Sequence, residues 1–544
     1  MEEKVEKKKN FIGGAAILGL AGVASKVLGA VFRIPLANII GDDGMGYYQT
    51  AYPIYIALLM ISSSGIPTAI SRMIAERRAK GLFKESQKIF SISSKIMIVI
   101  GLVTGVGLML LAKPICAYIQ EPDAVYCMMS VAPALIFCPI TSCFRGYFQG
   151  HKNMVPTAIS QVVEQIFRVS IGFALAMVLL RIDKAHAAAG ATFGASIGGF
   201  FAFLYMFIVF LRNRKTKQEV SELVLDANAV LPPSKDLLKE IAIIAIPITL
   251  GSMIMPVINT IDTVLVKSRL ISIGYSSDVA RGMFGQLTGM ASPIINMPDA
   301  ITAAVSMSLV PIIADANKKG DMPFVKENAQ LALRYAVLVG LPCVFGIAVL
   351  AEPIMLLLYP LQQEAALSAA QCLVAYSAGI VFLAVHQALS GVLQGIGEQN
   401  TPAINLLVGA GVKIVATYVL CGIPSINVRG AAYGTVIAYM ISAFLNFRAV
   451  KKKTGLQIDI SLCVIKPLIA SASMGLIAWL VYKLARMACG NSIATLLAVF
   501  AGVVCYVVLV FVTGSIAKED LKGVKKLEKL VNLLDKVLPS GKIK

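Results

Sequence analysis

Long runs of apolar residues recur along almost the whole chain, and short polar connections separate them. A helix needs about 20 such residues to cross a bilayer. The pattern predicts fourteen membrane-spanning helices, over residues 11–40, 47–71, 89–112, 124–147, 156–180, 186–211, 241–266, 282–313, 331–350, 366–393, 402–421, 428–447, 460–483 and 491–514. Only 15% of the residues are charged, whereas a soluble protein carries about 25%. We therefore expect an all-α polytopic membrane protein.

Lysine and arginine are concentrated in alternate connections. They precede the first predicted span and follow the second, sixth, eighth and twelfth. Because cytoplasmic loops carry an excess of these residues, both termini are expected on the cytoplasmic side. The formal net charge of +19 follows this topology, so it does not indicate a nucleic-acid partner.

The last segment, residues 515–544, has a different pattern. Apolar residues recur at helical spacing from Leu521 to Leu534, and lysines occupy much of the other face. This pattern predicts a basic amphipathic helix. It would lie either on the inner membrane surface or on the cytoplasmic loops of the protein itself.

Three short motifs occur twice in the same order. "MIAERRAKG" (73–81) matches "IIADANKKG" (312–320), and "LAKPI" (111–115) matches "LAEPI" (350–354), both 239 residues apart. "GYFQGHKNMVP" (146–156) resembles "GVLQGIGEQNTP" (391–402). Because this spacing covers six spans, the two halves share one orientation. We expect an N-lobe (1–211), an inter-lobe loop (212–240), a C-lobe (241–450) and two added spans (451–514).

Two cations stand within the first predicted span. Lys26 and Arg33 are seven residues apart, so they share one helix face about 10 Å apart. Pro35 follows and is expected to bend the helix, because it removes a backbone donor. Ionisable side chains in spans usually face a cavity, and the span holds no acid that would neutralise them.

Other ionisable residues within or next to spans are candidates for a site. Glu164 and Arg168 stand at i and i+4 and are expected to share one face, either as a neutral packed pair or as a pair lining a cavity. Arg72 and Arg145, near helix ends, either reach the lipid headgroups or guard the inner mouth. Asp262 and Asp299 are the acids of the C-lobe, and with Glu164 they are candidates for coupling to sodium ions or protons.

The chain lacks sequence signals for catalysis. We find no GxxxxGK[ST] loop for ATP, no nucleophile–base motif and no metal-ligand spacing among its 10 cysteines and 3 histidines. We expect no enzyme activity and no cofactor beyond a coupling ion. A cavity lined by cations suits an anionic substrate such as a phosphate or diphosphate.

Several stretches resemble a known family. "SKVLGAVFRIPLANIIGDDGMGYYQTAYPIY", "SSSGIPTAISRMIAERRAKG", "FRGYFQGHKNMVPTAISQVVEQIFRV" and "NMPDAITAAVSMSLVPIIADA" are similar to the polysaccharide-transporter branch of the multidrug/oligosaccharidyl-lipid/polysaccharide (MOP) flippase superfamily. The resemblance is greatest to the stage V sporulation protein B group, which includes lipid II flippases of Gram-positive type. It covers the first twelve spans and implies a MATE-like fold of two pseudo-symmetric six-helix lobes.

The resemblance also implies a function. Members export undecaprenyl-diphosphate-linked sugars, such as lipid II, across the bacterial cytoplasmic membrane, and cell-wall synthases would be partners. Their N-lobe cavity is cationic, and Lys26 and Arg33 fall at or next to basic positions of the group. Two departures concern the substrate, because Ser62 to Ser64 and Pro293 stand where Gram-negative lipid II flippases have arginines.

Two other classes stay open on the sequence alone. A cation-coupled multidrug exporter of the same superfamily would place an acid in the first span, where this chain has two cations. A membrane scaffold for envelope or spore assembly would need neither the buried charges nor the repeat.

Overall fold

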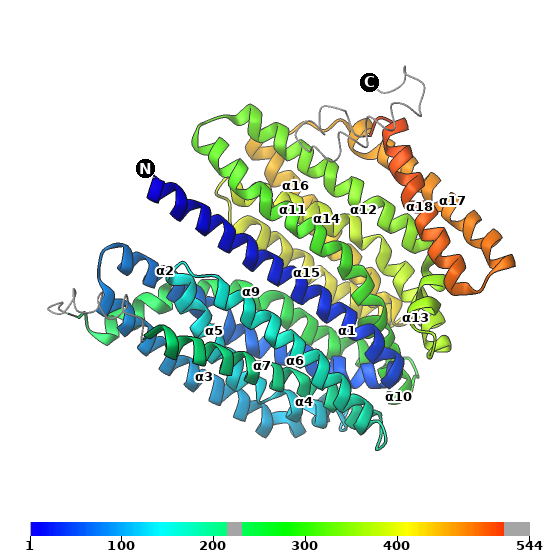
Figure 1. Cartoon of the computed structure of the whole chain (residues 1–544). Helices are drawn as coiled ribbons and strands as arrows, with labels where there is room; N and C mark the ends of the chain where they lie inside the picture. The colour runs from blue at the N-terminus through cyan, green and yellow to red at the C-terminus, as the bar shows by residue number, and fades with distance from the viewer. Residues whose placement is uncertain (1, 215–230, 516–544) are drawn as a thin grey trace. The chain divides into compact units, whose positions relative to one another are not determined.

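The computed structural model describes residues 2–214 and 231–515, without the side chains of residues up to 21, of Lys26 and of a few other positions. Within this part the chain is 88% helical and contains no strand (Figure 1). An all-helical architecture satisfies every backbone polar group inside lipid. The predicted all-α membrane fold is therefore confirmed. The predicted amphipathic tail lies almost entirely outside the described residues.

The helices form two compact units, divided between Met290 and Ala291. The first unit contains α1 (Glu2–Ser63), α2 (Gly65–Ala79), α3 (Phe83–Tyr118), α4 (Ala124–Val131), α5 (Ala134–Gly150), α6 (Val155–Leu179), α7 (Lys184–Arg214), α9 (Ser234–Ser272), α10 (Ser277–Gly285) and most of a π-helical turn (Gln286–Ala291). The predicted inter-lobe loop ends inside α9. Because the predicted lobes rest on the sequence repeat and not on compactness, their boundaries stay a prediction.

The second unit contains the helices after this turn. They are α11 (Ser292–Lys318), α12 (Met322–Leu358), α13 (Gln363–Ser377), α14 (Gly379–Gly395), α15 (Asn400–Cys421), α16 (Arg429–Thr454), a π-helical turn (Ser461–Ile465), α17 (Lys466–Ala488) and α18 (Asn491–Val512). The helices α17 and α18 pack on each other and on α12.

Among the described residues, eleven helices are long and apolar enough to span a membrane, or twelve if α13 and α14, bent by 41°, form one span. The predicted count of fourteen is not confirmed. The range Val31–Ala79 counts as one candidate, but it contains the non-helical Gly41, which separates the first two predicted spans.

The sequence suggested a bend at Pro35, but α1 is bent at Gly41 instead. Gly41 has φ 72° and ψ −174°, the one non-helical conformation within α1 in the described chain. Only glycine adopts this region readily, whereas Pro35 is accommodated within the helix. The chain changes direction sharply here, and the two halves of α1 diverge from this bend (Figure 1).

The sequence repeat is also visible in the structure. Two pairs of turns, each turn directly after a helix, have matching backbone geometry. Gly81 and Gly320, 239 residues apart, have φ 76° and 74°, and five equivalent backbone hydrogen bonds occur at both turns. Lys152 and Gly397 have φ 60° and 93° and share a second bonding pattern. A left-handed residue directly after a helix satisfies its last carbonyl groups. The repeated motifs therefore encode the same helix–turn–helix geometry.

Charged side chains tie α9 to earlier helices at both of its ends. Near its start, Glu240 accepts a hydrogen bond of 2.6 Å from Arg77 of α2, which also donates to Glu85 of α3 at 2.8 Å. Near its end, Lys267 lies 3.3 Å from Glu121. These contacts, together with apolar packing, place α9 in the first unit.

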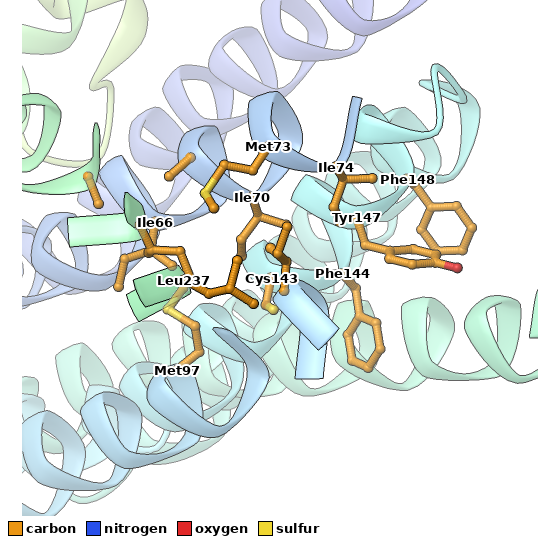
Figure 2. Packing of buried hydrophobic residues seen from close by; sticks show 14 of the residues in the cluster. Ile66, Ile70, Met73, Ile74, Met97, Cys143, Phe144, Tyr147, Phe148 and Leu237 are labelled. Atoms are coloured by element: carbon orange, nitrogen blue, oxygen red, sulfur yellow. The ribbon is translucent and has the colours of Figure 1, made fainter. Parts of the chain in front are cut away.

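A buried apolar cluster joins five helices of the first unit, α2, α3, α5, α7 and α9 (Figure 2). It includes Ile66, Ile70, Met73 and Ile74 of α2, Met97 of α3, Cys143, Phe144, Tyr147 and Phe148 of α5, and Leu237 of α9. Because lipid is as apolar as these side chains, the cluster is stabilised chiefly by close packing. It fixes α5, which carries Arg145.

Candidate functional site

The bend in α1 brings a cation of its first half onto an aromatic ring of its second half. The guanidinium carbon of Arg33 lies 5.3 Å from the centroid of the Tyr52 ring. This distance is within the range of a cation–π contact. Both residues are half-buried. The bend at Gly41 is therefore what turns a cation near the chain start into part of a site.

The helix α6 adds a second cation to the same ring. The guanidinium carbon of Arg168 lies 5.7 Å from the Tyr52 centroid. Glu164, one turn earlier, is bound by Arg145 of α5 and not by Arg168 as the spacing had suggested. Arg145 Nη2 donates to Glu164 Oε2 at 2.9 Å. These five residues form what we call the arginine–tyrosine cluster.

The pairing of Arg145 also positions it. Its Nε donates to Ser160 Oγ at 2.8 Å, on the same helix as Glu164. Arg145 is 16% exposed, so its side chain lies largely inside the protein. It neutralises Glu164, and the cluster as a whole keeps two more positive than negative charges.

A stripe of glycines on α7 supports the cluster from behind. A Cβ on Gly194 would lie 2.4 Å from the carbonyl oxygen of Arg168, and one on Gly198 would lie 2.5 Å from that of Glu164. These two glycines are four residues apart, as in the small-residue motifs that let membrane helices approach closely. The close contact of α6 and α7 therefore fixes the positions of Glu164 and Arg168 relative to α7.

Two further tyrosines hold the Tyr52 ring. Tyr48 stacks on it with centroids 5.4 Å apart, and Tyr55 lies 5.8 Å away. Tyr48 is 4% exposed and Tyr55 is 1% exposed. Because α1 spaces these rings three or four residues apart, they line one helix face. The sequence interpretation concentrated on charges and missed this aromatic row.

The structure does not place all the predicted cations in the cluster. Arg72 is exposed and pairs with Glu76 at 2.9 Å, one turn along α2. The side chain of Lys26 lies outside the described residues, although its backbone is part of α1. Arg33, Arg145 and Arg168 are therefore the predicted cations that meet.

The other two acids predicted as coupling residues, Asp262 and Asp299, lie on different helices. Asp262 is half-buried on α9. Asp299, on α11, accepts a hydrogen bond from the side-chain amide of Gln387 on α14. Ser306 Oγ donates to the backbone carbonyl of Gln387 at 2.7 Å. Asp299 thus belongs to a polar contact inside the second unit.

A buried charge cluster in the first unit was not predicted. It consists of Glu121, Lys267 and Arg281. Lys267 Nζ lies 3.3 Å from Glu121 Oε1, and Arg281 Nη1 lies 3.2 Å from Glu121 Oε2. The side chains of Glu121 and Lys267 are each 2% exposed. Glu121 was missed because it stands in the short polar connection "EPDA", which has the sequence pattern of a solvent-exposed loop.

Arg281 connects this cluster to its surroundings. Its Nη2 donates to Asp278 at 2.7 Å, and its guanidinium carbon lies 4.3 Å from the ring centroid of Tyr47. Burial lowers the pKa of Arg281, but Glu121 and Asp278 outweigh this effect and raise it. The arginine therefore stays charged, and Glu121 is fully engaged within the protein.

The two clusters differ in what they can bind. The described residues contain no group of three histidine, cysteine or acidic side chains that could hold a metal ion. Within the same part of the chain, neither Arg33 nor Arg168 makes an ion pair. Arginines without an acid inside membrane-spanning helices provide donors for an anion.

Comparison with known sequences gives two family matches. Residues 11–317 match the family described as "Polysaccharide biosynthesis protein", and residues 247–419 match the MatE family. The stage V sporulation protein B of Bacillus subtilis (strain 168) is 28% identical over 536 residues, which cover 96% of this chain and 99% of that protein. The lipid II flippase MurJ of the same organism is 26% identical, over 86% of this chain and 87% of that protein.

Solved structures with a similar fold come from the same two groups. A lipid II flippase MurJ in an inward closed conformation matches with a TM-score of 0.68 and 15% identity, over 91% of this chain and 98% of that one. An inward-facing multidrug resistance MATE family transporter of the MOP superfamily matches with a TM-score of 0.64 and 16% identity, over 79% and 94%. The predicted MATE-like fold is therefore confirmed.

Proposed function

Because this chain belongs to the polysaccharide biosynthesis protein family of the MOP flippase superfamily, we propose that it exports a lipid-linked cell-wall precursor. It is a multi-span membrane protein of a transporter and flippase superfamily. The proposed substrate is an undecaprenyl-diphosphate-linked saccharide, lipid II or a related molecule. The proposed route is alternating access across the bacterial cytoplasmic membrane.

The observation that carries this proposal is the excess of cations in the arginine–tyrosine cluster. Arg33 and Arg168 lie within membrane-spanning helices, and Glu164 is engaged by Arg145. A guanidinium binds phosphate oxygens through two parallel N–H groups. A diphosphate headgroup therefore supplies the charge that the cluster lacks.

The lipid part of the substrate needs no polar site. Its prenyl chain stays in the bilayer because it is as apolar as the lipid tails, while the headgroup enters the protein. Lys26 lies two turns before Arg33 and would add a third cation. Coupling to sodium ions or protons at Glu164, Asp262 or Asp299 stays a prediction, and the membrane potential already favours outward movement of an anion.

Removal of the two unpaired arginines tests the proposal. We expect Arg33→Ala and Arg168→Ala to lower the rate of lipid II flipping in proteoliposomes at least about tenfold, since each loses a charge-assisted contact. Both variants should also fail to support growth of a strain depleted of its lipid II flippase. Arg181→Ala, at an exposed position between α6 and α7, is the matched control.

Unchanged flipping and growth in both arginine variants would remove the basis of the proposal. The match of residues 247–419 to the MatE family favours one alternative, a multidrug exporter. Export of cationic dyes by the purified protein, with no flipping of lipid II, would establish that function instead.

A further inference from the structure

We propose that Tyr52 is a positioning residue that holds Arg33 and Arg168 close enough together for one diphosphate to contact both. This inference rests on the proposed function and adds a selectivity to it, for a diphosphate over a single phosphate.

The contacts of the ring are the first step. Arg33 and Arg168 come from α1 and α6, and each guanidinium carbon lies within 5.7 Å of the same Tyr52 centroid. The two cations are therefore no further apart than the sum of their distances to this ring. Their mutual repulsion is reduced because each also interacts with the electron-rich ring.

The second step is the rigidity of the ring. Tyr48 stacks on Tyr52 at an interplanar angle of 20°, and Tyr55 lies against it at 49°. Both neighbours are almost fully buried. A ring fixed in this way sets the position of two long side chains that would otherwise be free to rotate. Fixing charged donors before the ligand arrives increases affinity.

The third step is the electrostatic balance. Glu164 does not compete for the two arginines, because Arg145 binds it at 2.9 Å and Ser160 holds Arg145 in turn. Glu164 therefore occupies no donor of Arg33 or Arg168. One phosphoryl group engages one guanidinium well, whereas a diphosphate has oxygens for both.

The experiment uses the purified full-length protein and two probes that differ by one phosphoryl group. Farnesyl diphosphate and farnesyl phosphate share the same prenyl chain. We expect the wild type to bind the diphosphate at least about tenfold more tightly by calorimetry, because one further charge-assisted contact forms. Inorganic diphosphate, tested alongside, separates headgroup binding from binding of the lipid chain.

The ring variants decide the role of Tyr52. Tyr52→Leu should bring the ratio of the two affinities close to one, while Tyr52→Phe, which keeps the ring, should preserve it. Tyr52→Gln is a second variant without a ring, in case the leucine protein does not fold. A preserved ratio in a folded Tyr52→Leu or Tyr52→Gln protein overturns the inference.

Two further outcomes separate this inference from the proposed function. If the wild type binds both probes equally, or neither, the selectivity proposed for Tyr52 is wrong. If Arg33→Ala and Arg168→Ala leave binding of the diphosphate unchanged, the arginines are not the binding site and the proposed function itself fails.

Discussion

Among the described residues, the buried charged residues of the first unit are of two kinds, those paired within the fold and those without an acidic partner. Glu121 contacts both Lys267 and Arg281 and is 2% exposed, so its charge serves the fold. In the arginine–tyrosine cluster, the one acid is taken by Arg145. The Glu121 carboxylate is fully engaged by two cations of the protein. The two arginines around the Tyr52 ring have no acid of their own in the described chain and can bind an anion.

Removal of the Glu121 charge is expected to destabilise the protein strongly. Glu121→Gln leaves Lys267 and Arg281 buried without an acid between them. Breaking a buried ion pair from one side costs about 3–5 kcal/mol, and the midpoint of thermal unfolding in detergent measures the loss. Asp278→Asn is the control, because Asp278 contacts the same arginine but is 81% exposed. Equal losses in the two variants would contradict a role for burial.

At the level of helices, glycines decide where charged residues meet. Gly41 bends α1 and brings Arg33 to Tyr52. Gly194 and Gly198 let α7 approach the backbone of α6 at Arg168 and Glu164. In each case the glycine lacks a side chain that would change the path or the spacing of the helices.

A methyl group on Gly194 should displace the site. The Cβ of Gly194→Ala would lie 2.4 Å from the Arg168 carbonyl oxygen, so α6 and α7 must separate. Such overpacking costs about 1–3 kcal/mol, and we expect both the unfolding midpoint and the flipping rate to fall. Gly107→Ala on α3, whose Cβ meets no atom within 4 Å, should change neither. A wild-type flipping rate in Gly194→Ala would contradict this role of α7.

The stability of the first turn of α7 should depend on pH. Asp183 accepts hydrogen bonds from the backbone and the ring of His186 at 2.7 and 2.8 Å. Burial raises the pKa of Asp183, but these bonds outweigh it and lower the pKa. A carboxyl whose pKa is lowered on folding stabilises the helix start above its ordinary value of about 3.9, and this support is lost as the pH falls through the lowered pKa.

Hydrogen exchange of the His186 amide measures this loss. Its protection should decrease as the pH falls below about 4 in the wild type, after correction for intrinsic exchange rates. Asp183→Asn keeps a good helix cap but does not titrate. The same pH dependence in both proteins would rule out Asp183 as its source.

The sequence predicted the helices and several site residues because both signals are local. Apolar runs identify spans, and Arg33, Arg145, Glu164 and Arg168 are noticeable as charges within or next to them. The pairing of Glu164 with Arg145 was not predictable from spacing, because the partner comes from another helix. Glu121 was missed since a charged residue in a short connection is usually exposed, and only the fold shows that α9 and α10 cover it.

At the scale of the whole molecule, the predicted topology and the proposed substrate together predict a direction of transport. The basic connections predict both termini on the cytoplasmic side, and the substrate proposed here is an anion. An inside-negative potential favours outward movement of an anion by about 2.3 kcal/mol per charge for each 100 mV. Export of the proposed anion could then be driven by the membrane potential alone.

The membrane potential should therefore control the rate. In proteoliposomes with a potassium gradient and valinomycin, a potential that is negative on the side holding the lipid II headgroup should accelerate its flipping. Collapse of the potential should slow it, and reversal should slow it further. A rate that is the same under all three conditions would contradict potential-driven export.

The ties at the two ends of α9 have a consequence for biogenesis. The ribosome makes Arg77 and Glu121 long before Glu240 and Lys267, their partners on α9. A nascent chain that ends before Ser234 therefore has Glu121 without either of its cations. The buried charge cluster is complete only when both α9 and α10 have been made. Assembly of the first unit thus depends on the synthesis of these two helices through one glutamate.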